Sequence, residues 1–337
     1  MTVLVTGGAG YIGSHTVRAL QQAGEAVLVL DNLVYGHRAI AEDVLAVPLV
    51  VGQLGDRALL DALLRGDHPQ LPAGPVQAVL HFAAYAYVGE SVSEPAKYYR
   101  NNLGDTLVLL EALRQESQRR GTAIPLVFSS TCATYGQPER VPMDESLPQR
   151  PINPYGESKL LFEKILDWYR TIHGLDFVGL RYFNAAGASQ RFGEHHRVET
   201  HLIPNLLKVS LGQASQASVF GDDYPTPDGT CIRDYIHVLD LADAHMRAIE
   251  PGKSGFFNLG NGGGYSVREV LDTCERVTGH KIPVTIQPRR AGDPPRLIAS
   301  AEKARRELGW VPKYPRLDDI VATAWAWHRD HPLGYSD

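Results

Sequence analysis

The sequence predicts an α/β protein built on a doubly wound parallel sheet, followed by a smaller, loop-rich substrate domain. Short apolar runs alternate with helical patterns through the first half of the 337-residue chain. A glycine-rich turn follows the first of these runs, and after residue 183 prolines accumulate and the helical patterns shorten. We therefore expect a dinucleotide-binding domain over residues 1–183 and a substrate domain over 184–337. We allow for a strand and a helix of the second part to return to the first.

The expected elements follow in chain order. Apolar, β-branched runs predict strands at residues 2–6, 26–30, 47–51, 78–83, 124–129 and 177–182. Amphipathic patterns predict helices at residues 14–23, 57–64, 98–120, 155–172, 267–277 and 317–329. Strands that alternate with helices imply right-handed crossovers and hence a parallel sheet.

Composition excludes several classes of protein. The 33 Lys and Arg residues against 38 Asp and Glu residues give a net charge of −5 with no basic run, so we expect no nucleic-acid partner. No apolar segment approaches the roughly 20 residues of a membrane span, and the N-terminus enters the first strand directly, without a signal peptide. Three scattered cysteines suit a reducing cytoplasm. We expect no metal site, because His195, His196 and His201 lie in a charged loop without a matching set of cysteines or carboxylates.

The turn after the first strand has the glycine spacing of a dinucleotide site. Gly7, Gly10 and Gly13 separate the strand from the helix that follows. Such glycines permit a tight turn, a close approach of the backbone to a pyrophosphate and close packing of helix on strand. Asp31 ends the second strand, where a carboxylate accepts hydrogen bonds from ribose hydroxyls and repels a 2′-phosphate. The pattern therefore predicts NAD rather than NADP.

Tyr155 and Lys159 are spaced to share one face of a helix, about 6 Å apart. A tyrosine has an ordinary pKa of about 10, which a neighbouring ammonium and a nicotinamide cation both lower. Thr131 follows the strand at 124–129, at the edge of the sheet where a substrate would bind, and can share a proton with Tyr155. Together Thr131, Tyr155 and Lys159 predict hydride transfer at an alcohol carbon.

Several longer segments make the chain resemble the UDP-glucose 4-epimerase branch of the extended short-chain dehydrogenase/reductase family over essentially its full length. The matching segments are residues 7–15, 81–84, 88–91, 98–102, 154–156, 181–184, 221–224, 228–230, 233–238, 258–260 and 288–293. Residues 84–88, 130–134 and 229–231 also resemble the UDP-arabinose 4-epimerases. The resemblance therefore implies UDP-glucose and UDP-galactose as the substrates, with UDP-xylose and UDP-arabinose as the alternative.

The resemblance implies a set of cofactor-binding residues. They are Gly7, Gly10, Tyr11, Ile12, Gly13, Asp31, Asn32, Tyr35, Gly36, Gln53, Leu54, Phe82, Ala83, Ala84, Asn101, Ser129, Tyr155, Lys159, Tyr182 and Phe183. Gln53 stands where the family usually has an acidic residue for the adenine amine, and Ala86 replaces a common lysine. Thr131 stands where the family usually has serine, and it keeps the hydroxyl.

The resemblance also implies a UDP-sugar site. Its residues are Thr131, Tyr155, Asn184, His201, Leu202, Phe220, Arg233, Arg290, Asp293 and Leu297. Asn184, Arg233 and Arg290 would hold the diphosphate, since guanidinium groups match phosphate oxygens in geometry and charge. Phe220 would pack on the uracil, Asp293 would take the ribose hydroxyls, and Leu297 would border the sugar. A plain ion pair of Arg233 with Asp234 or Asp240 is the structural alternative.

The implied reaction is NAD-dependent 4-epimerisation of a UDP-sugar, in which the hydride leaves C4, the 4-keto sugar rotates and the hydride returns to the opposite face. A 4,6-dehydratase would need Asp-Glu after the threonine, where this chain has Cys132-Ala133. A nucleotide-sugar decarboxylase and a non-catalytic NAD-binding sensor are the remaining alternatives.

Two further expectations concern assembly and specificity. Apolar positions on the two long helices, Leu107, Leu110 and Leu113, and Leu161, Ile165 and Trp168, predict a homodimer through a four-helix bundle, as the resemblance implies. Leu297 is expected to admit N-acetylated sugars weakly, because leucine is smaller than the tyrosine of strict relatives.

Overall fold

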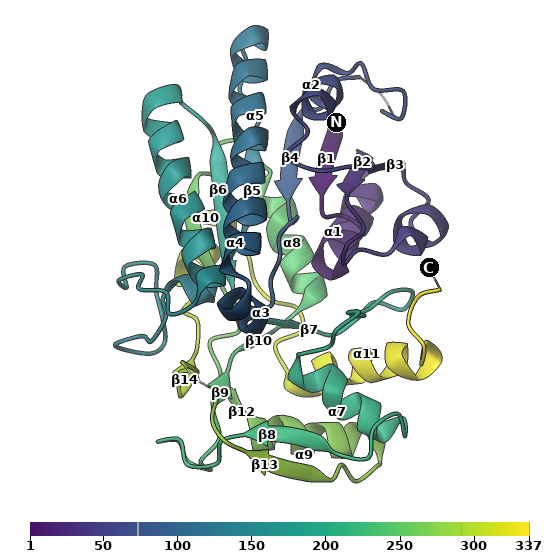
Figure 1. The fold of residues 1–337 in the computed structure, drawn as a ribbon, viewed down its shortest axis with the longest axis vertical. Coiled ribbons are helices and arrows are strands. Elements are labelled where there is room, and N and C mark those ends of the chain that lie inside the picture. The colour runs from purple at the N-terminus through teal and green to yellow at the C-terminus, as the bar shows by residue number, and fades with distance from the viewer. Residues whose placement is uncertain (73, 291, 337) are drawn as a thin grey trace.

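The computed structural model describes residues 1–72, 74–290 and 292–336 (Figure 1). Its centre is a seven-stranded parallel sheet in the order β11-β6-β5-β4-β1-β2-β3. The strands are β1 (Thr2–Thr6), β2 (Ala26–Asp31), β3 (Leu49–Val51), β4 (Ala78–His81), β5 (Leu126–Thr131), β6 (Phe177–Tyr182) and β11 (Gly255–Leu259). The order reverses between β1 and β4, which is where doubly wound sheets bind their ligands. The predicted fold class is confirmed.

Helices cover both faces of the sheet, because its strands are apolar on both sides. In β1, Val3 and Val5 pack into one core, whereas Leu4 packs into the core on the opposite face. The first core is covered by α1 (Tyr11–Gln22), η1 (Ile40–Val44), α8 (Val238–Ala248) and α10 (Glu302–Leu308). The second is covered by α2 (Arg57–Arg65), α5 (Thr106–Arg120) and α6 (Pro154–His173).

A second region lies beyond the carboxyl ends of β1 and β4, in the lower part of Figure 1. The helices α7 (Leu202–Ser210), α9 (Val267–Thr278) and α11 (Leu317–Asp330) share its apolar core. Its strands form small sheets: β7 (Asn184–Ala186) with β10 (Tyr235–His237), β8 (Ala217–Phe220) with β13 (Val284–Gln287), and β9 (Ile232–Arg233) between β12 (Tyr265–Ser266) and β14 (Arg296–Leu297). The boundary is not a clean cut after residue 183, since β11 extends the main sheet beside β6 and α8 packs on α1.

The long helix expected at residues 98–120 is interrupted. The chain forms α3 (Val88–Ser93), α4 (Pro95–Tyr98), a wide helical segment η2 (Tyr99–Asp105) and then α5. In η2, the amide of Asn102 exchanges two hydrogen bonds of 2.9 Å with the backbone of Tyr85. The widened turns thereby tie this helix to the loop after β4. Among the described helices, none is both long and apolar enough to cross a bilayer.

Candidate active site

The glycine-rich loop is shaped by backbone contacts that exclude side chains. Gly7 has φ +74°, and a Cβ there would lie 2.5 Å from the Ala83 nitrogen in the loop after β4. A Cβ at Gly13 would lie 2.3 Å from the Gly7 carbonyl oxygen. Gly10 caps the N-terminus of α1, and no side chain of the described residues caps the helix there. The first-turn N–H groups are thus available to an anion such as a pyrophosphate.

Asp31 ends β2 beside this loop and is held by backbone donors. Its carboxylate accepts hydrogen bonds from Ala9 N at 3.1 Å and Leu33 N at 2.9 Å. Burial raises the pKa of Asp31, and these hydrogen bonds partly offset the rise. A Cβ at Gly36 would lie 2.8 Å from the same carboxylate. The backbone at Gly36 therefore packs directly against the Asp31 carboxylate.

A pocket opens at the switch point between β1 and β4. Of the predicted cofactor residues it is lined by Gly7, Gly10, Asp31, Asn32, Tyr35, Gly36, Gln53, Leu54, Phe82, Ala83, Ala84 and Asn101. Leu30, Gly52 and Tyr85 line it as well and were missed, although each adjoins a predicted residue. Tyr11, Ile12, Gly13, Ser129, Tyr155, Lys159, Tyr182 and Phe183 do not line it. The oxygen of the Gln53 amide accepts a hydrogen bond of 3.1 Å from Asn32.

Tyr155 and Lys159 lie one turn apart in α6, whose start is well defined. Asn153 caps the helix by accepting a 2.8 Å hydrogen bond from Gly156 N, and Pro154 occupies the first helical position. Lys159 is buried and donates a 2.8 Å hydrogen bond to the Ser129 carbonyl oxygen at the end of β5. The helix cap and this hydrogen bond fix both side chains against β5.

Burial dominates the acid–base properties of this pair. It raises the pKa of Tyr155 to about 12, and a hydrogen bond with Thr131 partly offsets the rise. Burial lowers the pKa of Lys159 to about 7, against the attraction of Glu163. The expected lowering of the Tyr155 pKa is therefore not produced by the polypeptide charges alone. Next to them, Ser129 hydrogen-bonds the phenol of Tyr182, and burial raises the pKa of Tyr182.

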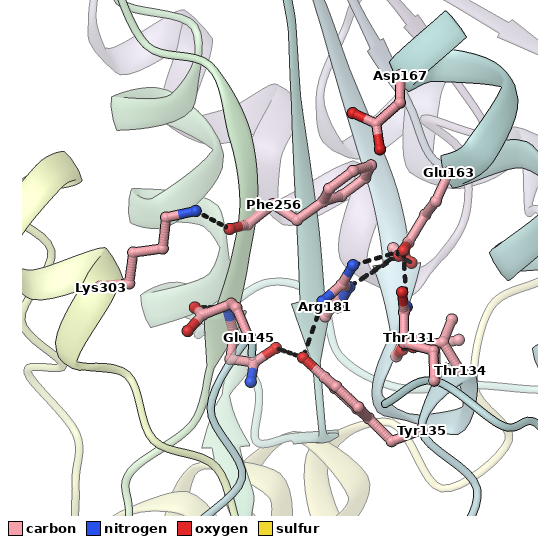
Figure 2. A network of polar contacts seen from close by, with 12 residues as sticks. Thr131, Thr134, Tyr135, Glu145, Glu163, Asp167, Arg181, Phe256 and Lys303 are labelled. Atoms are coloured by element: carbon pink, nitrogen blue, oxygen red, sulfur yellow. Dashed lines mark hydrogen bonds and ion pairs between the residues drawn. The ribbon is translucent and has the colours of Figure 1, made fainter. Parts of the chain in front are cut away.

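A buried ion pair, which was not predicted from the sequence, lies next to these residues. Figure 2 shows Arg181 of β6 directed toward Glu163 of α6, at 2.7 Å, and toward the Tyr135 hydroxyl, at 2.8 Å. Ser130 of β5 donates to the same carboxylate. Glu163 lies one turn after Lys159, so the network fixes α6 to β5 and β6 at the level of the catalytic side chains. In the sequence, the only indication of this network was a charged residue, Arg181, within an otherwise apolar strand.

Of the predicted nucleotide-sugar residues, Thr131 and Tyr155 lie at the main sheet, whereas Phe220, Arg233, Arg290 and Asp293 lie in the second region. Arg233 pairs with Asp293, and the Arg290 guanidinium lies 4.1 Å from the centre of the Phe220 ring. The alternative pairing of Arg233 with Asp234 or Asp240 is wrong. The Asp234 carboxylate accepts from Asn261, Gly262 and Ala299 backbone N–H groups, and that of Asp240 from Lys313 and Tyr314. Ala291, inside the 288–293 segment, is outside the described residues.

Leu297 and Phe183 join the two regions. Leu297 of β14 pairs in register with Arg233 of β9 and packs on the apolar cluster that contains Phe183, as Cys132 also does. Asn184 follows Phe183 and donates its backbone N–H to the Asp234 carbonyl oxygen at 3.0 Å. Leu297 is thus near both a predicted diphosphate ligand and a predicted cofactor residue.

His201 and Leu202 begin α7, and the two residues lie in different surroundings. Leu202 packs on the apolar core of the second region. His201 lies against two carboxylates, its Nδ1 atom 2.9 Å from Glu194 and 3.1 Å from Glu199. Burial lowers the pKa of His201, but the two carboxylates outweigh burial and raise it to about 10. The expectation that the histidines of this loop lack matching carboxylates is wrong for His196 and His201, whereas His195 stacks on His37 with the ring centres 4.8 Å apart.

Comparisons with known proteins agree with one another. The model of the NAD dependent epimerase/dehydratase family matches residues 3–260. The chain is 52% identical to a UDP-glucose 4-epimerase of Halalkalibacterium halodurans, with 100% of the chain and 98% of the relative covered. The solved UDP-glucose 4-epimerase of Brucella ovis in complex with NAD has a TM-score of 0.88 at 47% identity, covering 96% of this chain and 97% of that one. That of Bifidobacterium longum in complex with NAD+ and UDP has a TM-score of 0.90 at 39% identity, covering 99% and 100%.

Proposed function

The chain belongs to the NAD-dependent epimerase/dehydratase family, and we propose that it is a UDP-sugar 4-epimerase that interconverts UDP-glucose and UDP-galactose. One observation carries the proposal. Tyr155 hydrogen-bonds Thr131 at the carboxyl end of β5, and Lys159, one turn further along α6, donates to the Ser129 carbonyl oxygen of the same strand. Relatives about half identical to this chain over its whole length are UDP-glucose 4-epimerases.

The residues divide the chemistry among them. NAD, when bound, would supply the hydride acceptor for C4 of the sugar and a positively charged ring that favours a tyrosinate. Tyr155 takes the proton of the sugar 4-hydroxyl and later gives it back, and the Thr131 hydroxyl lies in hydrogen-bonding contact with that phenol. Lys159 donates a hydrogen bond to the Ser129 carbonyl oxygen, and its protonated form adds positive charge one helical turn from Tyr155.

The diphosphate anchor is supported by the paired side chains of the second region. Arg233 is almost completely buried and pairs with Asp293, so a diphosphate would compete with that carboxylate for the guanidinium group. Arg290 stacks on Phe220, which places a cation next to a ring that can pack on a uracil. Holding the nucleotide firmly and the sugar loosely lets the 4-keto sugar turn over between the two hydride transfers.

The residue after Thr131 argues against the dehydratase alternative. Burial raises the pKa of the Cys132 thiol to about 12, so it stays protonated and cannot remove a proton from the sugar near neutral pH. Ala133 has no ionisable group. Elimination of water from the sugar therefore lacks its acid and base.

The test is to incubate purified protein with UDP-galactose and identify the sugar nucleotides at equilibrium by chromatography. We expect UDP-glucose to form without net production of NADH. Faster conversion of UDP-xylose to UDP-arabinose would assign the pentose instead, and a 4-keto-6-deoxy product would indicate a dehydratase. If the protein bound NAD but turned over no UDP-sugar, it would instead be a non-catalytic NAD-binding sensor.

We also propose a homodimer in which α5 and α6 form a four-helix bundle with a second copy. The two helices lie side by side (Figure 1), joined by a hydrogen bond from Tyr169 to Glu111. Trp168 and Ile172 on α6 are 65% and 64% exposed, and Leu107 on α5 is 37% exposed. Exposed large apolar side chains on neighbouring helices support an interface.

Part of the reasoning behind the dimer was wrong, because Leu110 and Leu113 are fully buried in the core of their own chain. The interface would instead involve Leu107, Leu161, Trp168 and Ile172. Sedimentation at micromolar concentration should give a dimer, and Trp168→Glu should shift it toward monomer. A monomeric wild-type protein would rule the dimer out.

We propose that the protein is cytoplasmic, because its three thiols are free. Cys132, Cys231 and Cys274 are all free, and burial raises the pKa of each. Free, protonated thiols persist in a reducing compartment. Fractionation of the source cells, with the protein detected by antibody, tests this.

A further inference from the structure

Four metal-ligating side chains converge in the loop before α7. Glu194, His196, Glu199 and His201 each offer one ligand atom, and these atoms all lie within 4.8 Å of one another. They come from a segment of eight residues with the pattern Glu-x-His-x-x-Glu-x-His. Nothing in the epimerisation chemistry uses this combination of two imidazoles and two carboxylates.

The separations within this His/Glu cluster fit a tetrahedral cation. His196 Nδ1 lies 3.4 Å from Glu194 Oε1 and 3.3 Å from Glu199 Oε2. His201 Nδ1 lies 2.9 Å from Glu194 and 3.1 Å from Glu199. Four ligands at roughly 2.0–2.1 Å from a zinc ion are separated from one another by about 3.3 Å. Each nitrogen therefore has one oxygen of each carboxylate close to the spacing of a coordination tetrahedron, with Glu199 facing His196 through Oε2 and His201 through Oε1.

The burial and the charge of the His/Glu cluster also favour a bound cation. The side chains of Glu194 and Glu199 are only 5% and 3% exposed. Two carboxylates brought together with so little solvent need compensating positive charge. A divalent cation would replace the proton that the two carboxylates otherwise hold on His201. With both imidazoles neutral, the four side chains carry a net charge of −2, which such a cation balances.

We propose that Glu194, His196, Glu199 and His201 form a binding site for a divalent transition-metal ion of the zinc class. Imidazole and carboxylate ligands suit such ions, and a set of four protein ligands with no open position is typical of a structural site rather than a catalytic one. The proposal does not depend on the proposed epimerase function.

The position of the site indicates what the ion would do. His201 caps α7 in the second region, while the His196 ring lies 6.3 Å from the ring of Tyr11 in α1 and 6.1 Å from that of Tyr87. Tyr11 follows the glycine-rich loop, and its hydroxyl donates to the Gly187 carbonyl oxygen at 2.6 Å. An ion here would tie the start of α7 to the segment that packs on the cofactor loop. It would therefore stabilise the junction between the two regions.

The experiment measures Zn²⁺ binding to purified full-length protein after dialysis against a chelator. Calorimetric titration should give one Zn²⁺ per chain, and saturation should raise the midpoint of thermal unfolding by about 4 °C. Co²⁺ in place of Zn²⁺ should give the intense visible bands of tetrahedral coordination. Loss of one ligand in His196→Gln or Glu199→Gln should weaken binding by at least about tenfold.

The matched control is His280→Gln, because His280 is an exposed histidine remote in sequence from the cluster. It should bind Zn²⁺ like the wild type. Circular dichroism of each variant establishes that it is folded before titration. The proposal is overturned if folded wild-type protein takes up no Zn²⁺, if Co²⁺ gives only the weak bands of octahedral coordination, or if His196→Gln and Glu199→Gln bind as tightly as His280→Gln. In each of those cases the four residues form an ion-pair cluster only.

Discussion

The cofactor region and the nucleotide-sugar region are built in different ways. Asp31 ends one strand of the parallel sheet, and Gly7 and Phe82 each follow another. Close backbone contacts determine the shape of their pocket. Arg233 and Asp293 come from segments far apart in the chain, and they contact each other through side chains. The cofactor region is thus shaped by steric exclusion, whereas the nucleotide-sugar region is assembled from charges that a ligand can exchange. Substitutions should affect the two regions differently.

The largest effect is expected where the regions meet. Tyr155→Phe keeps the ring and removes the oxygen that carries the proton, so turnover of UDP-galactose should fall by about 10²–10⁴-fold. Binding of NAD and of UDP should both persist, measured by calorimetry on the same preparation. Tyr169→Phe, on the same helix, is the control and should remain active. Wild-type turnover in Tyr155→Phe would disprove the assigned role.

The next effect separates the two binding regions. Arg233→Gln removes the guanidinium group, so the KM for UDP-galactose should rise roughly 10–100-fold, while the affinity for NAD stays unchanged. Steady-state kinetics and an NAD titration check this. Arg233→Lys should recover little, because an ammonium cannot form the two parallel hydrogen bonds. An equal loss of NAD affinity would contradict the division into two regions.

Gly13→Ala probes the steric character of the cofactor region. The added Cβ would lie 2.3 Å from the Gly7 carbonyl oxygen, so either the loop or the helix must move. We expect a loss of about 1–3 kcal/mol in the free energy of unfolding and weaker NAD binding. Gly263→Ala, whose Cβ would meet no atom within 4 Å, serves as the control. Unchanged NAD affinity in Gly13→Ala would show that the loop tolerates a side chain.

Lys159 should make stability depend on pH. Its pKa is lowered from 10.5 to about 7 in the folded protein, so above about pH 7 the unfolded chain binds the proton more tightly than the folded one. The free energy of unfolding should therefore rise between about pH 7 and pH 9, by about 2 kcal/mol from this group. Urea unfolding of wild type and Lys159→Met at each pH measures this: the free energy of unfolding of wild type minus that of the variant should rise by about 2 kcal/mol from pH 7 to pH 9. A difference that does not change with pH would mean that Lys159 titrates normally.

The smallest effect concerns the sugar pocket. Leu297 packs on the apolar cluster that contains Phe183. Leu297→Tyr should therefore lower activity on UDP-N-acetylglucosamine relative to UDP-galactose by about tenfold, since apolar pockets discriminate by about 1–3 kcal/mol. The ratio of the two activities is the measurement. If the ratio stays constant, another residue borders the N-acetyl group.

The sequence alone determined what depends on local geometry. Strand and helix periods identified six of the seven strands of the main sheet but not β11, which comes from the second half of the chain. The spacing of Gly7, Gly10 and Gly13 identified the turn, because that pattern reflects backbone sterics within a few residues. Tyr155 and Lys159 could be paired for the same reason, since a helix brings together residues four apart. Residues that line the pocket beside a strand end, such as Asp31, followed from the parallel order of the strands.

Only the tertiary structure decided which distant groups meet. Arg233 pairs with Asp293 rather than with its sequence neighbour Asp234, because the Asp234 carboxylate is taken up by backbone N–H groups of two other loops. The exposure of Trp168 and the burial of Leu110 depend on which helix faces lie over the sheet. Partners of charged side chains and the faces of helices depend on how chain segments pack across the fold, and no local pattern encodes that packing.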